Sequence, residues 1–144
     1  MPANTSPIFP LTPNVSWGTL ATANTAKDGT GTVVTLFTAG ASGSRIDQIK
    51  VRALGSNVAT VLRLFVNNGV DPTTATNNSL IHETTIAATT LSETSELADN
   101  DILITKGDFV FAPIPFLPAG YKITATIGTT VAAGLQCTIH GGDY

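Results

Sequence analysis

The stretch VATVLRLFVNNG, residues 58–69, has the residue alternation of a β-strand and ends in the turn signal Asn-Asn-Gly. Its apolar side chains fall on both faces of the expected strand, because Leu62 and Leu64 point to one side and Val61 and Phe65 to the other. One face can pack in the core of a small domain. The second face must be covered too, by another part of this chain or by another molecule, and we predict a second copy of the chain.

Arg63 shares the second face with Val61 and Phe65. A guanidinium that is buried there needs a carboxylate or carbonyl partner, because an unpaired charge is costly to remove from water. Two interpretations remain open: the side chain reaches solvent from a half-exposed face, or it forms a buried ion pair between subunits. Val61, Arg63 and Phe65 are therefore candidate interface residues.

The period of two continues from Gly18 onward, and β-branched residues dominate. Turn signals rich in Gly, Asn, Asp and Pro separate the segments, with no amphipathic helix between them. Short strands at this spacing predict an all-β fold, an antiparallel sandwich or barrel. The expected strands are 18–24, 32–38, 45–54, 58–67, 79–88, 102–104, 108–117, 121–127 and 134–140.

Three of these strands alternate cleanly, which predicts that one face is buried and the other exposed. The segments TVVTLFT and SLIHETTIA instead carry apolar groups on both faces, as VLRLFVN does. The expected inward sets of the three one-sided strands are Ile49, Val51 and Ala53; Tyr121, Ile123, Ala125 and Ile127; and Leu135, Cys137 and Ile139.

Residues 1–17 precede the first expected strand and are interpreted as an extended N-terminal arm, with a single β-domain over 18–144. Prolines restrict the backbone of the arm and remove hydrogen-bond donors. Apolar side chains interrupt it, and these favour a groove over free solvent. Either the arm lies along its own sheet, or it docks on or is exchanged with a partner. The prolines are Pro2, Pro7, Pro10 and Pro13, and the apolar residues are Ile8, Phe9, Leu11, Val15 and Trp17.

The composition of the 144 residues argues against several partners. Only 12% are charged and the net charge is -3, with no adjacent basic residues, so a phosphate-binding surface for nucleic acid is not expected. No apolar run is long enough for a membrane helix, and the first residues lack the pattern of a secretory signal. We therefore expect a soluble chain that is made in the cytoplasm.

Metal and catalytic motifs are sparse. The turn at Pro118, Ala119 and Gly120 fits a cupin-like metal enzyme, but Ile123 stands where the next histidine ligand should be. His82, beside Glu83, has no histidine two residues away, and a cluster of these two residues with His140 is disfavoured because neighbours on a strand point to opposite faces.

The acidic segment 93–108 lacks the spacing of a calcium loop and is interpreted as a solvated loop. Cys137, the single cysteine, is expected to be a buried small side chain. With no hydrolase or phosphate-binding motif present, we predict a protein that is not an enzyme and that uses no cofactor. The acidic residues of the segment are Glu93, Glu96, Asp99, Asp101 and Asp108.

The whole-chain pattern, a Pro-rich apolar arm followed by Thr-rich strands with few charges, resembles the jelly-roll head decoration (cement) proteins of tailed bacteriophages. Pieces that carry the resemblance are VATVLRLFVNNG, the Leu-Pro-Ala-Gly-Tyr turn at 117–121 and GGDY at 141–144. The resemblance implies an antiparallel β-sandwich of jelly-roll type. It also implies a homotrimer on the capsid surface of the virion that bridges major capsid subunits, after assembly in the host cytoplasm.

A decoration protein of this kind would act mechanically, with aromatic and apolar residues as its contacts. A tail- or fibre-associated β-sandwich that binds a receptor or carbohydrate is the alternative. The expected interface residues are Ile8, Phe9, Leu11, Trp17, Val61, Arg63, Phe65 and Tyr144.

Overall fold

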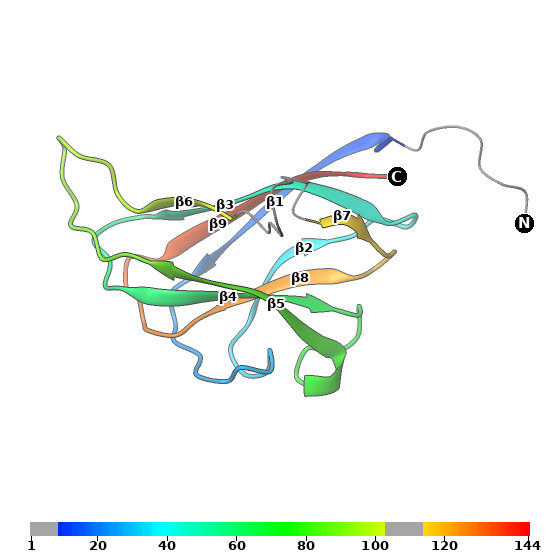
Figure 1. The fold of residues 1–144 in the computed structure, drawn as a ribbon, viewed down its shortest axis with the longest axis horizontal. Helices are drawn as coiled ribbons and strands as arrows, with labels where there is room; N and C mark the ends of the chain where they lie inside the picture. The colour runs from blue at the N-terminus through cyan, green and yellow to red at the C-terminus, as the bar shows by residue number, and fades with distance from the viewer. Residues whose placement is uncertain (1–8, 103–113) are drawn as a thin grey trace, which may run out of the picture.

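Nine strands, all paired antiparallel, make up the regular structure in residues 9–102 and 114–144, which are the residues that the computed structural model describes, together with one short 3₁₀ turn at Ala75–Asn77 (Figure 1). No helix in these two ranges is long and apolar enough to cross a membrane. The strands are β1 (Thr12–Leu20), β2 (Val34–Thr38), β3 (Ser44–Ala53), β4 (Thr60–Asn67), β5 (Asn78–Ile86), β6 (Asp99–Asp101), β7 (Ile114–Leu117), β8 (Lys122–Ile127) and β9 (Leu135–Asp143).

The strands form two layers (Figure 1). The first sheet has the order β1-β9-β3-β6, with β7 also paired to β3, and the second has the order β2-β8-β4-β5. These two antiparallel sheets confirm the predicted all-β sandwich. Several consecutive strands, such as β1, β2, β3 and β4, alternate between the sheets, which is compatible with the jelly-roll type.

The core lies between the two sheets and is built from the expected inward faces. Of the three predicted sets, only Tyr121 is partly exposed, and it packs against the core. The bulge in β3 between Ile46 and Gln48 shifts its pairing with β9 but leaves the alternation intact from Ile49 onward. Burial of one face per strand therefore explains the clean alternation in the sequence.

The chain itself covers part of the second face of β4. The loop between β1 and β2 runs across the outer side of the second sheet (Figure 1), where the carbonyl of Asn24 accepts a hydrogen bond from Arg63 at 3.3 Å and Gly29 lies against Asn78 of β5. Phe65 is fully buried and Val61 half-buried on this face. The expectation that a second copy covers Phe65 is therefore corrected: of the two coverings considered, the structure has the one within the chain.

Arg63 is buried and has both kinds of partner that its charge requires. Its Nε lies 2.7 Å from the carboxylate of Glu83 on β5, and its Nη1 donates to the Asn24 carbonyl. The ion pair joins two neighbouring strands of one chain, so the expected snorkelling and the expected contact between subunits are both replaced by an intrachain pair. Asn24 shapes the covering loop, since its side chain donates to the carbonyls of Thr30 and Thr32.

Strand boundaries near the prolines differ from prediction. The first strand begins at Thr12 instead of 18, so the last six residues of the expected arm belong to the sheet. Pro13 is tolerated because β1 is an edge strand of its sheet. β6 lies just before the expected strand 102–104, most of which, like the start of the expected strand 108–117, lies outside the described residues.

Candidate interaction surface

The outer side of β1 carries an apolar stripe, which we define as Leu11, Pro13, Val15 and Trp17. Alternate residues of the strand point inward: Ser16 donates to the carbonyl of Leu36 at 2.5 Å, and Gly18 lies against Val34 and Leu36 of β2. The stripe therefore points away from the core. Leu11 is 83% exposed, Trp17 63% and Val15 48%, and Phe9, just before the strand, is 67% exposed.

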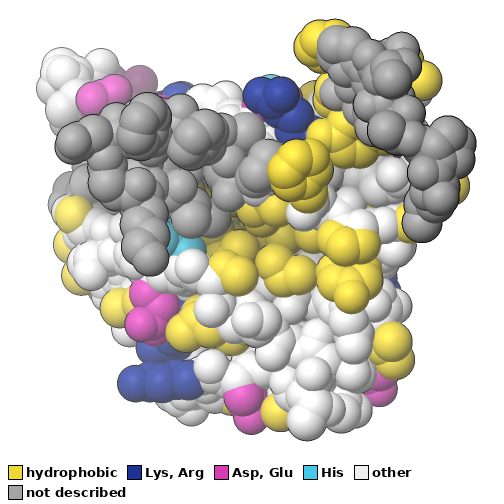
Figure 2. All heavy atoms as spheres, turned by 45° about the vertical axis from the view of Figure 1, so that its right-hand side comes forward, with side chains coloured by type: hydrophobic (Ala, Val, Ile, Leu, Met, Phe, Trp, Pro, Cys, Tyr) yellow, Lys and Arg dark blue, Asp and Glu magenta, His cyan; other side chains and the backbone are white. Residues whose placement is uncertain are grey.

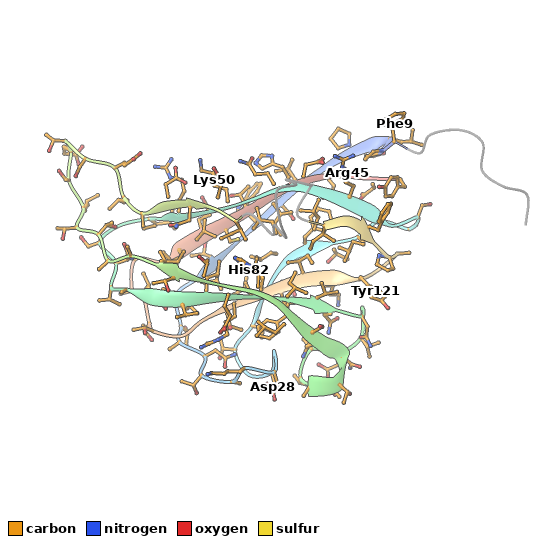
Figure 3. The ribbon with its side chains drawn as sticks, in the orientation of Figure 1. Phe9, Asp28, Arg45, Lys50, His82 and Tyr121 are labelled. Atoms are coloured by element: carbon orange, nitrogen blue, oxygen red, sulfur yellow. The ribbon has the colours of Figure 1, made fainter. Side chains whose placement is uncertain are left out.

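An exposed strand face normally carries polar side chains, and the neighbouring strands follow that rule. Trp17 pairs with Thr138 of β9, and Thr138 in turn pairs with Lys50 of β3; Val15 pairs with His140. Figure 3 shows Phe9, Arg45 and Lys50 along the same outer side of the molecule, with Asp28 on the opposite side. The apolar stripe is thus bordered by a polar face, as the centre of a protein interface is bordered by its rim.

The charged groups of this face are mostly paired with one another. Asp99 of β6 forms ion pairs with Lys50 at 3.2 Å and with Arg52 at 3.8 Å, and Arg45 pairs with Asp47 at 2.6 Å. These pairs are solvent-exposed and contribute little stability. Because these positive and negative side chains pair, the described residues of this part of the face have no strong excess of either sign of charge.

The side chain of Asp143 links β1, near the beginning of the stripe, to β9 and β3. Its carboxylate accepts two bonds from Asn14 of β1, at 3.0 and 3.1 Å, and one from Ser44 of β3. Burial raises the pKa of Asp143, but the hydrogen bonds from Ser44, Asn14 and the Gly40 backbone lower it by more, so the net pKa lies below its usual value. One carboxylate thereby joins β1, β9 and β3.

An apolar pocket of about 520 Å³ opens at the same end of the sheet. Ser44 of β3 pairs with Asp143 of β9 on one side and with Leu117 of β7 on the other. The pocket lies where these three strands meet, and residues at or beside the paired positions line it. Figure 2 shows apolar side chains gathered across the middle of this end of the molecule. The lining residues are Ser42, Gly43, Phe116, Leu117, Pro118 and Tyr144.

The predicted interface residues separate into two groups. Phe9, Leu11 and Trp17 lie along one side of β1, and Tyr144 lines the pocket beyond the end of β9. Arg63 and Phe65 are buried on the outer side of the other sheet, with Val61 half-buried beside them. Ile8 lies outside the described residues.

Sequence reasoning missed Phe116, which is 79% exposed. Its neighbour Leu117 is buried, so alternation about Leu117 would have placed Phe116 on the other face. The segment FVFAPIPFL hid this signal, because it is apolar at almost every position and prolines interrupt it.

The residues considered for metal binding are not brought together. His82 is on β5 and His140 on β9, in different sheets. Among the residues that the structure describes, no three His, Cys, Asp or Glu side chains form a group that could hold a metal ion. Of the acidic segment, Asp99 pairs with Lys50 and Arg52, Asp101 accepts a bond from Gln48, and Asp108 lies outside the described residues.

Cys137 is fully buried in the core, as its alternating context predicts. This burial raises the pKa of its thiol to about 12. The thiolate that reactive cysteines need is therefore strongly disfavoured at neutral pH.

Comparisons with known proteins give one structural likeness. No model of a known protein family matches the chain, and no curated protein matches its sequence. Among solved structures, a chain of the "Cyanophage Pam1 capsid asymmetric unit" is similar to this one with a TM-score of 0.41 and 14% sequence identity, over 100% of this chain and 100% of that chain.

Proposed function

We propose that this protein is a non-enzymatic structural protein of a bacteriophage virion, which binds the outside of the assembled capsid and stabilises it by bridging major capsid subunits. The observation that supports the proposal is the apolar stripe of β1, whose large side chains are 48 to 83% exposed on an otherwise polar face. Contiguous apolar surface of this kind marks a contact with another macromolecule. Covering each large apolar side chain contributes roughly 1.5–3 kcal/mol.

The shape of the stripe suits a bridging contact. The stripe runs along β1 and the residue before it, Leu11, so at about 3.3 Å per residue it is about 20 Å long. A contact of that length can lie across the joint between two neighbouring subunits. Because such a joint exists only after assembly, binding stabilises the assembled shell over free subunits by mass action.

The charge pattern supports a protein surface as the partner. Lys50, Arg52 and Arg45 each lie within ion-pair distance of an aspartate, so the described residues of the outer face form no cluster of unpaired cations for phosphate groups of nucleic acid or anionic lipid. The proposed partner is the major capsid protein, and the proposed location is the capsid surface of a virion assembled in the host cytoplasm.

Trp17→Ala tests this function. We expect the variant to bind purified capsids of the phage that encodes the protein at least tenfold more weakly in a co-sedimentation titration, because the largest side chain of the stripe is lost. Leu91→Ala is the matched control, since Leu91 is similarly exposed in the loop between β5 and β6 and should bind as the wild type does.

The free energy of unfolding of Trp17→Ala and of Leu91→Ala shows whether a loss of capsid binding comes from the interface or from unfolding. Because Trp17 is mostly exposed, its loss should change the free energy of unfolding by less than about 0.5–1 kcal/mol in urea titrations. Unchanged capsid binding by Trp17→Ala, or unfolding of the isolated variant, would contradict the assignment of Trp17 to the interface.

A receptor- or carbohydrate-binding module is the second candidate, and one observation favours it. Trp17 lies beside Thr138, with His140 and Gln48 on the next row, which gives an aromatic surface bordered by hydrogen-bonding groups. Sugars bind to such shallow sites. Binding of the purified protein to a glycan array, lost in Trp17→Ala, would favour this function over capsid binding.

A further inference from the structure

The end of the sheet near Asp143 carries two apolar features of complementary kind. One is a short proline-containing segment, Phe9-Pro10-Leu11, whose Phe9 and Leu11 side chains are 67% and 83% exposed. The other is the pocket between Tyr144 and Phe116. Pro-rich extended segments are recognised by grooves lined with aromatic residues, since the restricted backbone loses little entropy on binding.

The pocket has the construction that such recognition needs. Ser42 and Gly43, which have little or no side chain, separate Tyr144 from Phe116 and Pro118. The site therefore has aromatic or proline side chains on both sides of the turn before β3, whose small residues leave room for a ligand. Its volume of about 520 Å³ is within the range of pockets that hold a compact apolar group.

The segment Phe9-Pro10-Leu11 does not fill the pocket of its own chain. The Leu11 amide donates to the Asp143 carbonyl at 2.8 Å, and Pro10 lies against Gly142. These contacts hold the segment at β9 on its β1 side, whereas the pocket lies where β9, β3 and β7 meet. Phe9 is held at this place and is mostly exposed, so it is available to enter the pocket of a second copy of the chain.

We propose that Phe9, with Pro10 beside it, inserts between Tyr144 and Phe116 of a neighbouring copy of this chain. Because the inserting segment and the receiving pocket are different surfaces, the contact is heterologous and builds a closed ring or an open chain of copies. A ring of three would agree with the homotrimer that the resemblance to decoration proteins implies. This inference is independent of capsid binding, and its test uses the purified protein alone.

The first test is the mass of the protein in solution. Size exclusion with light scattering, over a tenfold dilution, should give an oligomer for the wild type and predominantly monomer for Phe9→Ser and for Phe116→Ser, with an increase of at least tenfold in the dissociation constant. Val70→Ser is the matched control, since Val70 is 57% exposed in the turn after β4 and its loss should leave the oligomer unchanged. A monomeric wild type, or two variants that assemble as the wild type does, would overturn the proposal.

Mixing the two variants separates this contact from any symmetric interface. Phe9→Ser keeps an intact pocket and Phe116→Ser keeps an intact inserting segment, so one productive contact is possible for each pair of chains. The mixture should form 1:1 dimers that cannot close a ring, although each variant alone is monomeric. A mixture that stays monomeric would refute the contact between segment and pocket, and an oligomer larger than a dimer would show that other residues hold the copies together.

Discussion

At the scale of single residues, two aromatic side chains with similar sequence surroundings differ in their exposure to solvent. Phe65 and Trp17 both lie in strands with the period of two, yet Phe65 is fully buried and Trp17 is 63% exposed. Phe65 lies on β4, in the interior of its sheet, on the face that the loop after β1 crosses. Trp17 is exposed because it lies on the outer face of its sheet, where no described segment covers it.

Asp143 offers a pH-dependent prediction at this scale. Its net pKa is lowered in the folded protein, so its contribution to stability is complete above the unfolded value near 4 and is lost as the pH falls through the folded value. The difference in free energy of unfolding between wild type and Asp143→Asn should therefore stay constant from about pH 7 to 5 and shrink below about pH 4.

Urea titrations across that pH range measure this difference. The comparison with the variant is needed because the pKa values of Asp28 and Asp71 are also lowered, by hydrogen bonds from Thr30 and Thr73, and these groups change the wild type and the variant alike. A difference that persists undiminished to pH 2.5 would show that the carboxylate charge is not what joins β1, β9 and β3.

At the scale of elements, the close approach of β9 to β3 allows β9 to extend as far as Asp143 at the end of the first sheet. Gly141 pairs with Ile46 beside the bulge in β3, and a side chain at Gly141 would overlap the backbone oxygen of Arg45. Glycine at this position lets β9 continue to Asp143, beyond the residue where sequence reasoning ended the strand. The added residues bring Asp143 to Asn14 and Ser44 and so position both the stripe and the pocket.

Gly141→Ala tests this close approach. The overlap is with backbone, which relaxes poorly, so we expect the free energy of unfolding to fall by about 2–3 kcal/mol. Gly120→Ala is the comparison: its Cβ meets nothing within 4 Å but its φ is +73°, so only backbone strain of about 1 kcal/mol is expected. Urea unfolding of the two variants should rank them in this order, and equal losses would contradict the packing argument.

At the scale of the whole molecule, the two sheets present different outer surfaces. The outer side of the second sheet is partly closed by the chain's own loop, with Arg63 paired beneath it, whereas the outer side of the first sheet carries the apolar stripe, which no described segment covers. Association through the stripe and the pocket would bury apolar groups, and the nearby charges are already paired. The molecule should therefore associate by apolar burial more than by charge attraction.

Salt dependence checks this expectation. Raising sodium chloride from about 0.05 to about 0.5 M screens exposed charges strongly, so association that depends on ion pairs weakens over this range. We expect the dissociation constant for self-association to change by less than about threefold, measured by light scattering at both salt concentrations. A tenfold or larger weakening would indicate that the charged rows of β3 and β6 make the contact instead.

The sequence alone was sufficient for the class of fold and for the inward faces of β3, β8 and β9. Alternation, turn residues and β-branched residues are local signals that can be read from the sequence. Burial of one face of a strand produces the alternation directly. For the apolar residues before Gly18 the sequence predicted a groove, on the same chain or on a partner, and their exposure within the chain is known only from the structure. The expected contacts of Phe9, Leu11 and Trp17 with a partner stay predictions.

Only the tertiary structure decided which apolar faces remain open. Val61, Arg63 and Phe65 look as available as Leu11 and Trp17 in the sequence, but Phe65 is fully buried and Arg63 is bonded to a loop some forty residues earlier in the chain. The pocket likewise combines residues near positions 43, 117 and 144, which meet only because β3 pairs with both β7 and β9. Alternation shows which side chains share a face of a strand, whereas the pairing of distant segments decides what lies over that face.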